Sequence, residues 1–350
     1  MKVLLLGGSG LLGQNVLRLL LQRHHTVRLL LRDGVNAPLP AGGVEIQRGS
    51  LLDDAVLERA VRGCEAVVNC AGTTDMSLRR LEDYMPVNRD LCLRLVRMME
   101  CCGVTIWVQV STANTIGYGL PDRWAAEDAP MRDPFGHSLY ARSKRAGEEV
   151  VVEAARRHPD WHLVLVNPGF IVGAYDAKPS SGQLLLAAYR RRLMVVPKGG
   201  KSFVPAVDVA TAVVNALTMG CSGERYLATG ENLSLRQFYR LQARSCGYRQ
   251  SCVSVPNGLL LMAGWLGDLL RAVGVRTQLS SCNVRQLMVR EYYCCDKAHR
   301  QLAMSSTSLK QAIVDFHSWR RDRSSPTDMC GLSATCPEEK RMNGTKEKTG

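Results

Sequence analysis

The chain has 350 residues, enough for one large hydrophobic core or for a main domain with a smaller companion. Its 46% hydrophobic and 22% charged residues are those of an ordinary globular protein. The net charge of +13 is spread along the chain, so nucleic-acid binding is not expected, and the dense basic patches at 190–192 and 320–323 are interpreted as solvated helix faces.

The thirteen cysteines are odd in number and form no CxxC pair, which argues against a zinc site and against a disulfide framework. We therefore expect reduced, mostly buried thiols and no bound metal. Met1–Leu6 is too short for a signal peptide and is needed as a strand, so a cytoplasmic location is predicted.

The first element is the apolar strand Met1–Leu6, which leads directly into a loop containing Gly7, Gly10 and Gly13 and then into a helical pattern. Glycine is required where the chain turns off a strand, where backbone approaches a pyrophosphate, and where the helix packs on the sheet. The N–H groups at the start of the helix are free to bind phosphates. This stretch predicts a dinucleotide-binding domain; the alternative is an ordinary tight turn.

Strands alternate with helical patterns through the first half of the chain. The predicted strands cover Met1–Leu6, Thr26–Leu31, Val44–Arg48, Ala66–Cys70, Ile106–Val110 and Leu163–Val166. The predicted helices cover Gly10–Arg23, Ala55–Val61, Leu91–Cys102 and Tyr140–Arg157. This alternation is typical of βαβ units, so we predict an α/β fold with a Rossmann-type, doubly wound parallel sheet.

Beyond Gly173 the alternation is less regular. Further helices are predicted over Gly182–Arg192, Val207–Met219, Leu235–Cys246 and Gly258–Val273. We expect residues 1–173 to form the dinucleotide-binding core and residues 174–323 a smaller substrate-side lobe interleaved with the last core strands. Residues 324–350 are rich in small, polar and charged residues with few apolar anchors, which predicts a disordered tail.

The segment Gly258–Val275 is apolar enough to suggest a membrane segment. Asp268 and Arg271 interrupt it, and its fully apolar part is shorter than the ~20 residues that a span requires. A buried helix is therefore the favoured interpretation, and membrane contact is not expected.

A candidate site for proton transfer is the pair Tyr140 and Lys144, which lie four residues apart on one face of a predicted helix. A lysine beside a tyrosine favours the phenolate and draws the tyrosine pKa down from about 10 toward neutrality. The alternative is an exposed tyrosine beside a solvated lysine. Ser111 and Thr112 follow the fifth strand at the sheet edge where ligands bind in such folds, and either hydroxyl can hold a substrate oxygen or simply form a turn.

With the glycine loop, the hydroxyls after the fifth strand and the Tyr-x-x-x-Lys pair in this order, the chain resembles the extended short-chain dehydrogenase/reductase family, the NAD-dependent epimerase/dehydratase-like group. The resemblance extends from Met1 to Trp319. Further matching stretches are Gly49–Asp53, Cys70–Gly72, Val87-Asn88, Asn167–Gly169 and Phe203–Ala210. The lengths and the predicted helix Ser308–Trp319 look most like dihydroflavonol-reductase-like and 3β-hydroxysteroid-dehydrogenase-like members.

The resemblance implies that Tyr140 is the general acid/base and that Lys144 lowers its pKa and holds the nicotinamide ribose. Thr112 occupies the position of the usual catalytic serine. The implied cofactor-binding residues are Gly7, Ser9, Gly10, Leu11, Leu12, Gly13, Arg32, Ser50, Leu51, Cys70, Ala71, Gly72, Asn88, Ser111, Tyr140, Lys144, Pro168, Gly169 and Ile171. Two positions depart from the family pattern: Ser50 replaces a common acidic residue, and Asn167 replaces a frequent arginine.

Cofactor choice depends on the end of the second strand. Asp33 lies 20 residues after Gly13, about where an NAD-selective carboxylate is expected. Arg32 competes with it, and the Leu-Arg-Asp ending resembles NADP-using reductases of this family, in which the arginine binds the 2′-phosphate. NADP is therefore favoured over NAD.

The resemblance implies an NAD(P)-dependent oxidoreductase that moves a hydride between the nicotinamide and a ketone or secondary alcohol. Two alternatives are a nucleotide-sugar epimerase or dehydratase with retained NAD, and a non-catalytic NAD(P)-binding regulator. The expected partner is a small-molecule substrate, for which the apolar helix hints at an apolar ketone, and a homodimer is left open.

Overall fold

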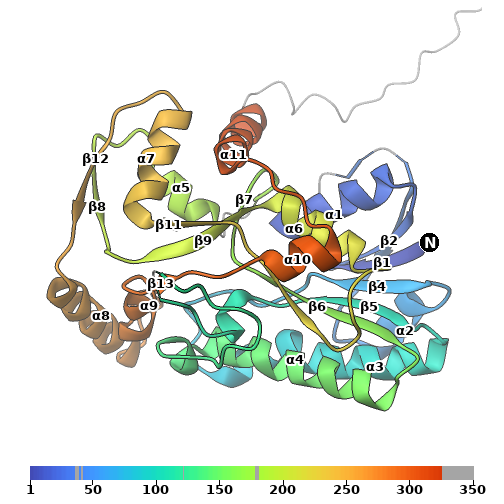
Figure 1. The fold of residues 1–350 in the computed structure, drawn as a ribbon. Coiled ribbons are helices and arrows are strands. Elements are labelled where there is room, and N and C mark those ends of the chain that lie inside the picture. Colours follow the sequence, from blue (N-terminus) through green and yellow to red (C-terminus); the bar gives the residue numbers. More distant parts are fainter. Residues whose placement is uncertain (36–38, 41, 121, 178–180, 325–350) are drawn as a thin grey trace, which may run out of the picture.

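The computed structural model describes residues 1–35, 39, 40, 42–120, 122–177 and 181–324 (Figure 1). The tail predicted at 324–350 lies outside these residues, apart from Ser324 at the end of a helix. A large parallel sheet with helices on both faces occupies one part of the molecule, and a second region of smaller sheets is joined to it (Figure 1).

Seven parallel strands form the large sheet, in the order β10-β6-β5-β4-β1-β2-β3. Their bounds are β1 Lys2–Leu6, β2 Thr26–Leu31, β3 Val44–Arg48, β4 Ala66–Asn69, β5 Ile106–Val110, β6 His162–Pro168 and β10 Arg225–Ala228. The central strands are mostly apolar and buried along nearly their whole length, because helices cover them on both sides. The strand order reverses beside β1, where the chain crosses from β3 to β4, so ligand binding is expected at the carboxyl ends of β1 and β4.

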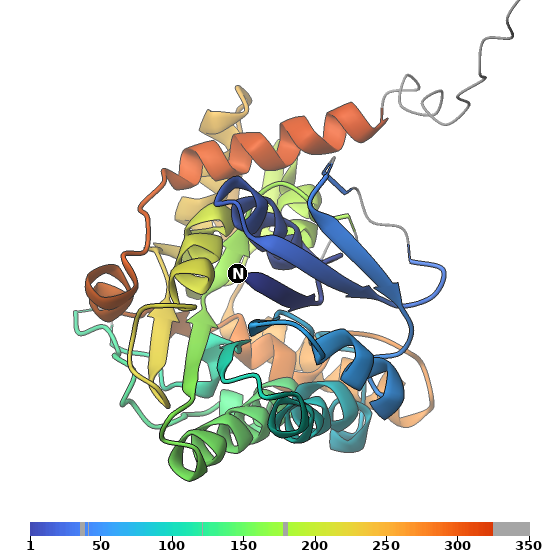
Figure 2. The same ribbon diagram turned by 90° about the vertical axis from the view of Figure 1, so that its right-hand side faces the viewer.

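Helices α1 (Leu11–Gln22) and α6 (Ala206–Asn215) cover one face of this sheet, and their apolar residues share a core with alternate residues of the strands. Helices α2 (Asp54–Val61), α3 (Leu91–Cys102) and α4 (Leu139–Arg157) cover the other face. Figure 2 shows the two helical layers above and below the strands. The predicted doubly wound α/β fold is confirmed, and each strand and helix predicted before residue 173 is present, with ends that agree to within two residues.

The second region contains short strands that the sequence analysis missed. Strands β7 (Phe170–Val172), β9 (Gly200–Pro205), β11 (Glu231–Ser234) and β13 (Arg290–Glu291) form one sheet, and β8 (Leu193–Val196) pairs in parallel with β12 (Ser251–Ser254). Around them lie α5 (Gly182–Ala188), α7 (Leu235–Ser245), α9 (Ser281–Gln286) and α11 (Leu309–Ser324). Helix α10 (Asp296–Leu302) packs instead against β10 and α6 of the large sheet. Strands of two to six residues are too short to show a clear alternation in sequence.

The helix predicted over Gly182–Arg192 ends at Ala188, and Arg190 has a φ of +57° in the turn that leads to β8. The basic run at 190–192 is therefore not on a helix face, and that interpretation is wrong. The second run, at 320–323, does lie on a helix, α11.

Helix α8 (Asn257–Ala272) also corrects the sequence analysis. Only Gly264 and Gly267 are buried in it, because their bare backbone packs against residues 279–281, and most of its large apolar side chains are exposed. The prediction of a buried helix is therefore wrong. No helix in the described part of the chain is both long and apolar enough to cross a membrane.

Candidate active site

The glycine-rich turn joins β1 to α1 where the strand order of the large sheet reverses. Gly7 has a φ of +75°, a left-handed conformation that favours glycine. A Cβ on Gly13 would lie 2.2 Å from the Gly7 carbonyl oxygen, so only glycine permits this close packing. The N-cap residue of α1 is Gly10, which has no side chain to cap the helix. The first N–H groups of the helix are therefore available to bind an anion. This turn, which also holds the predicted contacts Ser9, Leu11 and Leu12, fits the pyrophosphate of a dinucleotide.

The loop after β4 contains the predicted contacts Cys70, Ala71 and Gly72. Asn88 holds this loop from a distant part of the chain: its Oδ1 accepts a hydrogen bond from the Thr73 N–H at 2.8 Å, and its Nδ2 donates to the Thr73 carbonyl at 3.0 Å. A Cβ on Gly72 would lie 3.8 Å from the Lys144 ammonium nitrogen. The loop therefore lies close to Lys144, and a side chain at position 72 would reduce the space beside the Lys144 ammonium.

Tyr140 and Lys144 lie in the first two turns of α4. Ser138 caps this helix by accepting a hydrogen bond from the Ala141 N–H. The Thr112 side chain, at the end of β5, lies close enough to the Tyr140 phenol to favour its phenolate. Lys144 is buried, and its ammonium donates to the Val110 carbonyl oxygen at 2.7 Å. The structure thus brings Thr112, Tyr140 and Lys144 together at the carboxyl end of β5.

The pKa of Tyr140 is raised to about 12, mainly because burial disfavours the phenolate, and the nearby Thr112 side chain works in the opposite direction. Burial also lowers the pKa of Lys144 below its ordinary value, while the nearby Cys92, Glu148 and Cys70 side chains raise it. The expected fall of the Tyr140 pKa toward neutrality is therefore wrong for this structure. Its physical reason is that the Lys144 ammonium is turned to the Val110 carbonyl and desolvation dominates at the phenol.

The two neighbouring hydroxyls after β5 have different partners. Ser111 Oγ donates to Glu148 Oε1 at 2.5 Å, whereas the Thr112 side chain lies near the Tyr140 phenol. Thr112 also accepts a hydrogen bond from the Asn114 N–H at 3.3 Å, which begins a short helical turn. Thr112 is therefore the hydroxyl that the structure brings to Tyr140.

Glu148 is a site residue that the sequence analysis missed. Its side chain is fully buried and accepts hydrogen bonds from Ser111, from Thr115 at 2.6 Å and from Asn167 at 2.6 Å. Arg225 of β10 forms an ion pair with its other oxygen at 2.8 Å. The carboxylate thereby joins α4 to the ends of β5, β6 and β10. Its sequence signal is the spacing of four residues from Lys144, which places both side chains on the buried face of α4.

The remaining predicted contacts lie farther along the same edge of the sheet. Arg32 and Asp33 are both exposed, in a turn after β2. Ser50 follows β3, and its hydroxyl accepts from the Leu52 N–H at 3.1 Å, with Leu51 between them. After β6, the chain passes through Pro168 and Gly169 to Ile171 in β7, and a Cβ on Gly169 would lie 2.5 Å from the Ser202 carbonyl oxygen. Within the described residues, no group of His, Cys, Asp and Glu could hold a metal ion.

Fold and site together define a Rossmann-type enzyme with a dinucleotide-binding turn beside a Thr-Tyr-Lys group. The chain belongs to the NAD dependent epimerase/dehydratase family, whose model matches residues 3–228. It is accordingly an NAD(P)-dependent enzyme of the extended short-chain dehydrogenase/reductase type, and the resemblance found in the sequence is confirmed.

Two curated relatives align over most of the chain. Sterol demethylase protein B of Methylococcus capsulatus is 28% identical over 330 residues, covering 92% of this chain and 99% of that protein. The 4-hydroxy-2-methyl-3-oxo-4-farnesyl-3,4-dihydroquinoline-1-oxide ketoreductase of Stigmatella aurantiaca is 29% identical over 334 residues, covering 90% and 95%. Among solved structures, UDP-glucose 4-epimerase of Thermus thermophilus in complex with NAD has a TM-score of 0.71 and 21% identity, covering 92% of this chain and 99% of that one, and it shares the fold.

Proposed function

We propose that the protein is an oxidoreductase that interconverts a ketone and a secondary alcohol, with Tyr140 as the general acid/base. The observation that carries this proposal is the placement of Thr112, Tyr140 and the buried Lys144 together at the end of β5. A carbonyl oxygen placed between Thr112 and Tyr140 would meet two hydroxyl donors. Such a pair polarises a carbonyl and delivers one proton to it.

In the direction of reduction, Tyr140 donates its phenolic proton to the ketone oxygen, and Thr112 keeps that oxygen in place by a second hydrogen bond. The hydride that completes the alcohol is supplied by the nicotinamide ring when the cofactor is bound. With its pKa raised to about 12, Tyr140 is protonated at neutral pH, so the proton that reduction needs is present. Lys144, buried beside Gly72, is the residue proposed to hold the nicotinamide ribose. Oxidation of the alcohol is the reverse sequence.

The proposed substrate is an apolar ketone or alcohol. Support comes from the names of the two curated relatives, one a sterol demethylase protein and the other a ketoreductase acting on a farnesyl-bearing ketone. A panel of apolar ketones and alcohols, followed by the absorbance of NAD(P)H, tests the proposal. Absence of hydride transfer with every member of an apolar and a polar panel would overturn it.

The second candidate is a nucleotide-sugar epimerase or dehydratase, which the family match supports. Such an enzyme takes a hydride and returns it, so its NAD stays bound through the cycle. Measuring the cofactor content of the purified protein separates the two proposals, because a stoichiometric, retained NAD favours the second. A non-catalytic NAD(P)-binding regulator would bind the cofactor but would show neither turnover of a substrate nor hydride transfer.

The two hydroxyls after β5 are expected to respond differently to substitution. Thr112→Val should lower kcat by about ten- to a hundredfold, because it removes a hydrogen bond to the reacting oxygen while keeping the side-chain volume. Ser111→Ala should lower stability rather than kcat, since its partner is the buried Glu148 carboxylate. Steady-state kinetics and urea unfolding of both variants check this. A larger kcat loss in Ser111→Ala would assign the role to the other hydroxyl.

We further propose NADP rather than NAD as the preferred cofactor. Arg32 and Asp33 are both exposed where the strand β2 ends, so either side chain can turn toward an adenosine ribose. A guanidinium binds a 2′-phosphate through two parallel hydrogen bonds, and a carboxylate facing that phosphate repels it. Arg32→Ala should therefore weaken NADPH binding by about ten- to a hundredfold and leave NADH binding nearly unchanged.

Fluorescence titration of both cofactors against the wild type, Arg32→Ala and Asp33→Ala measures this effect. Asp33→Ala is the matched control, since the proposal predicts unchanged or tighter NADPH binding in that variant. A wild type that prefers NADH and loses the preference in Asp33→Ala would assign NAD instead.

A further inference from the structure

A row of exposed apolar side chains follows the outer side of α8. Leu259, Met262, Leu266, Leu269 and Val273 recur every three or four residues, so they form one stripe along the helix. Each is between 56% and 71% exposed, and Trp265 beside the stripe is 59% exposed. Such a stripe is unusual on a surface that faces water, and large contiguous apolar patches mark binding surfaces.

Charged residues of α8 do not interrupt this stripe, because both are used on its inner side. The Asp268 carboxylate accepts a hydrogen bond from the Ser281 N–H at 3.2 Å, which ties it to α9. The Arg271 guanidinium donates to the Leu78 carbonyl oxygen at 2.7 Å. The two residues that argued against membrane contact in the sequence therefore face the protein.

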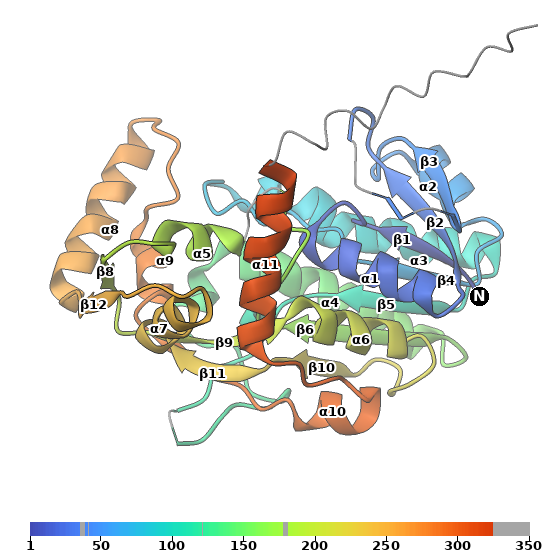
Figure 3. The same ribbon diagram turned by 90° about the horizontal axis from the view of Figure 1, so that it is seen from above.

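The strands β8 and β12 carry further exposed apolar side chains at the same end of the molecule (Figure 3). Val195 lies opposite Val253 in the parallel pair, and Leu193 lies on the same face two residues earlier. All three are more than half exposed, whereas the alternate residues Met194 and Cys252 pack on the core of the second region. Figures 1 and 3 place β8, β12 and α8 together at the end of the molecule opposite β3.

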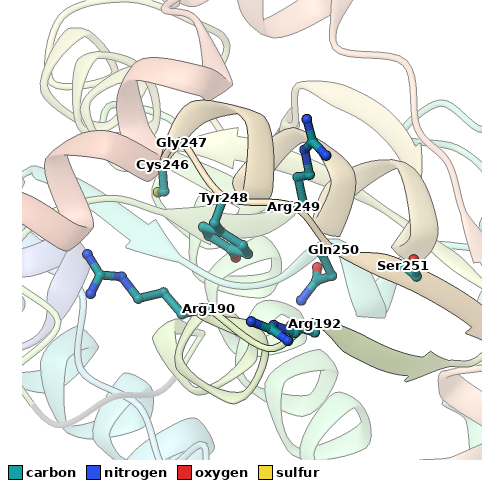
Figure 4. A pocket seen from close by; sticks show the side chains of 8 residues that line it. All are labelled: Arg190, Arg192, Cys246, Gly247, Tyr248, Arg249, Gln250 and Ser251. Carbon is teal, nitrogen blue, oxygen red and sulfur yellow. The ribbon is translucent and has the colours of Figure 1, made fainter.

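A cationic hollow of about 770 Å³ lies where β8 and β12 begin (Figure 4). Its lining includes Arg190, Arg192 and Arg249 and contains no Asp or Glu, and none of these arginines forms an ion pair with a described residue. Residues 182–198 and 235–276 together carry ten Arg or Lys and one carboxylate, Asp268. The stretches of chain that form the stripe and the hollow are therefore strongly positive.

We propose that this end of the protein binds the surface of a bilayer that contains anionic phospholipids. Helix α8 lies in the plane of the interface with its apolar stripe among the acyl chains, and the arginines of the hollow bind lipid phosphates. Trp265, with an apolar ring and one N–H donor, suits the headgroup level. The helix lies on the membrane and does not cross it, since it has 16 residues.

Charge favours a bilayer over a second copy of the chain. A two-fold dimer places the same surface against itself, so the arginines of one copy would approach those of the other. An anionic lipid surface attracts the same arginines, and the attraction weakens with salt.

The proposed surface borders the candidate active site. Asn283 Nδ2 of α9 donates to the Met76 carbonyl oxygen at 3.3 Å, and Arg276 pairs with Asp75 at 2.6 Å. These contacts hold residues 75–78. This segment comes directly after the loop that contains Gly72 and lies beside Lys144. Only the next step rests on the proposed function: the bilayer is then the source of the apolar ketone.

Co-sedimentation of the full chain with vesicles tests the proposal without measuring activity. The wild type should bind vesicles of phosphatidylcholine with phosphatidylglycerol and should bind pure phosphatidylcholine vesicles about tenfold more weakly. Leu266→Ser/Leu269→Ser should reduce binding to the mixed vesicles by about a hundredfold. Ile46→Ser is the matched control: it removes a half-exposed apolar side chain from β3 at the opposite end and should bind as the wild type does.

A second pair of variants tests the charge. Arg190→Gln/Arg192→Gln should lower binding to the mixed vesicles by about tenfold and reduce its salt dependence. Arg59→Gln/Arg97→Gln makes the same charge change at exposed positions of α2 and α3 and should have little effect. Circular dichroism of each variant confirms its fold.

Equal binding of wild type and Leu266→Ser/Leu269→Ser to the mixed vesicles would overturn the proposal. Absence of vesicle binding by the wild type would also overturn it. If Leu266→Ser/Leu269→Ser then converts a dimer into a monomer in sedimentation velocity, the apolar stripe is a dimer interface instead. Neither result bears on hydride transfer to a soluble ketone, so the failure of membrane binding and the failure of the proposed function are separate outcomes.

Discussion

Replacing Tyr140 by Phe is expected to lower kcat by roughly 10²–10⁴-fold, the range for loss of a positioned general acid. The substitution removes one hydroxyl and keeps the ring that packs at the start of α4. The Kd of the cofactor should stay within about threefold of the wild type, because no cofactor contact proposed here depends on the phenolic proton alone. Steady-state kinetics and a cofactor titration on the same preparation measure both quantities.

Tyr189→Phe is the control for this experiment. It makes the same chemical change in the second region, where Tyr189 stacks on His317 and lies far along the chain from α4. Its kcat should equal that of the wild type. Undiminished turnover in Tyr140→Phe would remove Tyr140 from the mechanism, and an equal loss in both variants would point to a general effect on folding.

Buried parallel strands are the part of this fold that the sequence predicts best. Thr26–Leu31 and Ile106–Val110 are apolar along nearly their whole length, since both faces of the sheet are covered, and the structure gives the same bounds. Gly13 was predicted from its spacing, and the 2.2 Å approach of its absent Cβ to Gly7 shows why glycine is needed. Local chemistry is sufficient to specify such elements.

Elements that depend on distant partners could not be predicted in this way. The hydropathy of α8 is the same whether another helix covers it or not, so its exposure became visible only in the structure. The pKa of Tyr140 depends on where the Lys144 ammonium points and on how much water reaches the phenol, and helical spacing specifies neither. Glu148 meets Arg225 across 77 residues of sequence.

Glu148→Gln is expected to lower the free energy of unfolding by about 3 kcal/mol, a value for breaking a buried ion pair on one side. The amide keeps the size of the side chain, and its oxygen can still accept the hydrogen bonds that Ser111, Thr115 and Asn167 give to Oε1. Its NH₂ group then takes the place of Oε2 and faces the Arg225 guanidinium, donor against donor, without the charge that holds Arg225. The Arg225 guanidinium, only partly exposed, then lacks its carboxylate. Urea unfolding followed by circular dichroism measures the change.

Glu149→Gln is the matched control, because the next residue of α4 carries the same group on the solvent side. Its side chain is exposed and pairs with Arg145 at 3.3 Å, so the loss should be about 0.5 kcal/mol or less. A loss of stability in Glu148→Gln no greater than this would show that the hydrogen bonds and the ion pair of Glu148 contribute little to the free energy of unfolding. The expected difference follows from burial alone: both residues are glutamates paired with arginine, and only Glu148 lacks water to replace its partner.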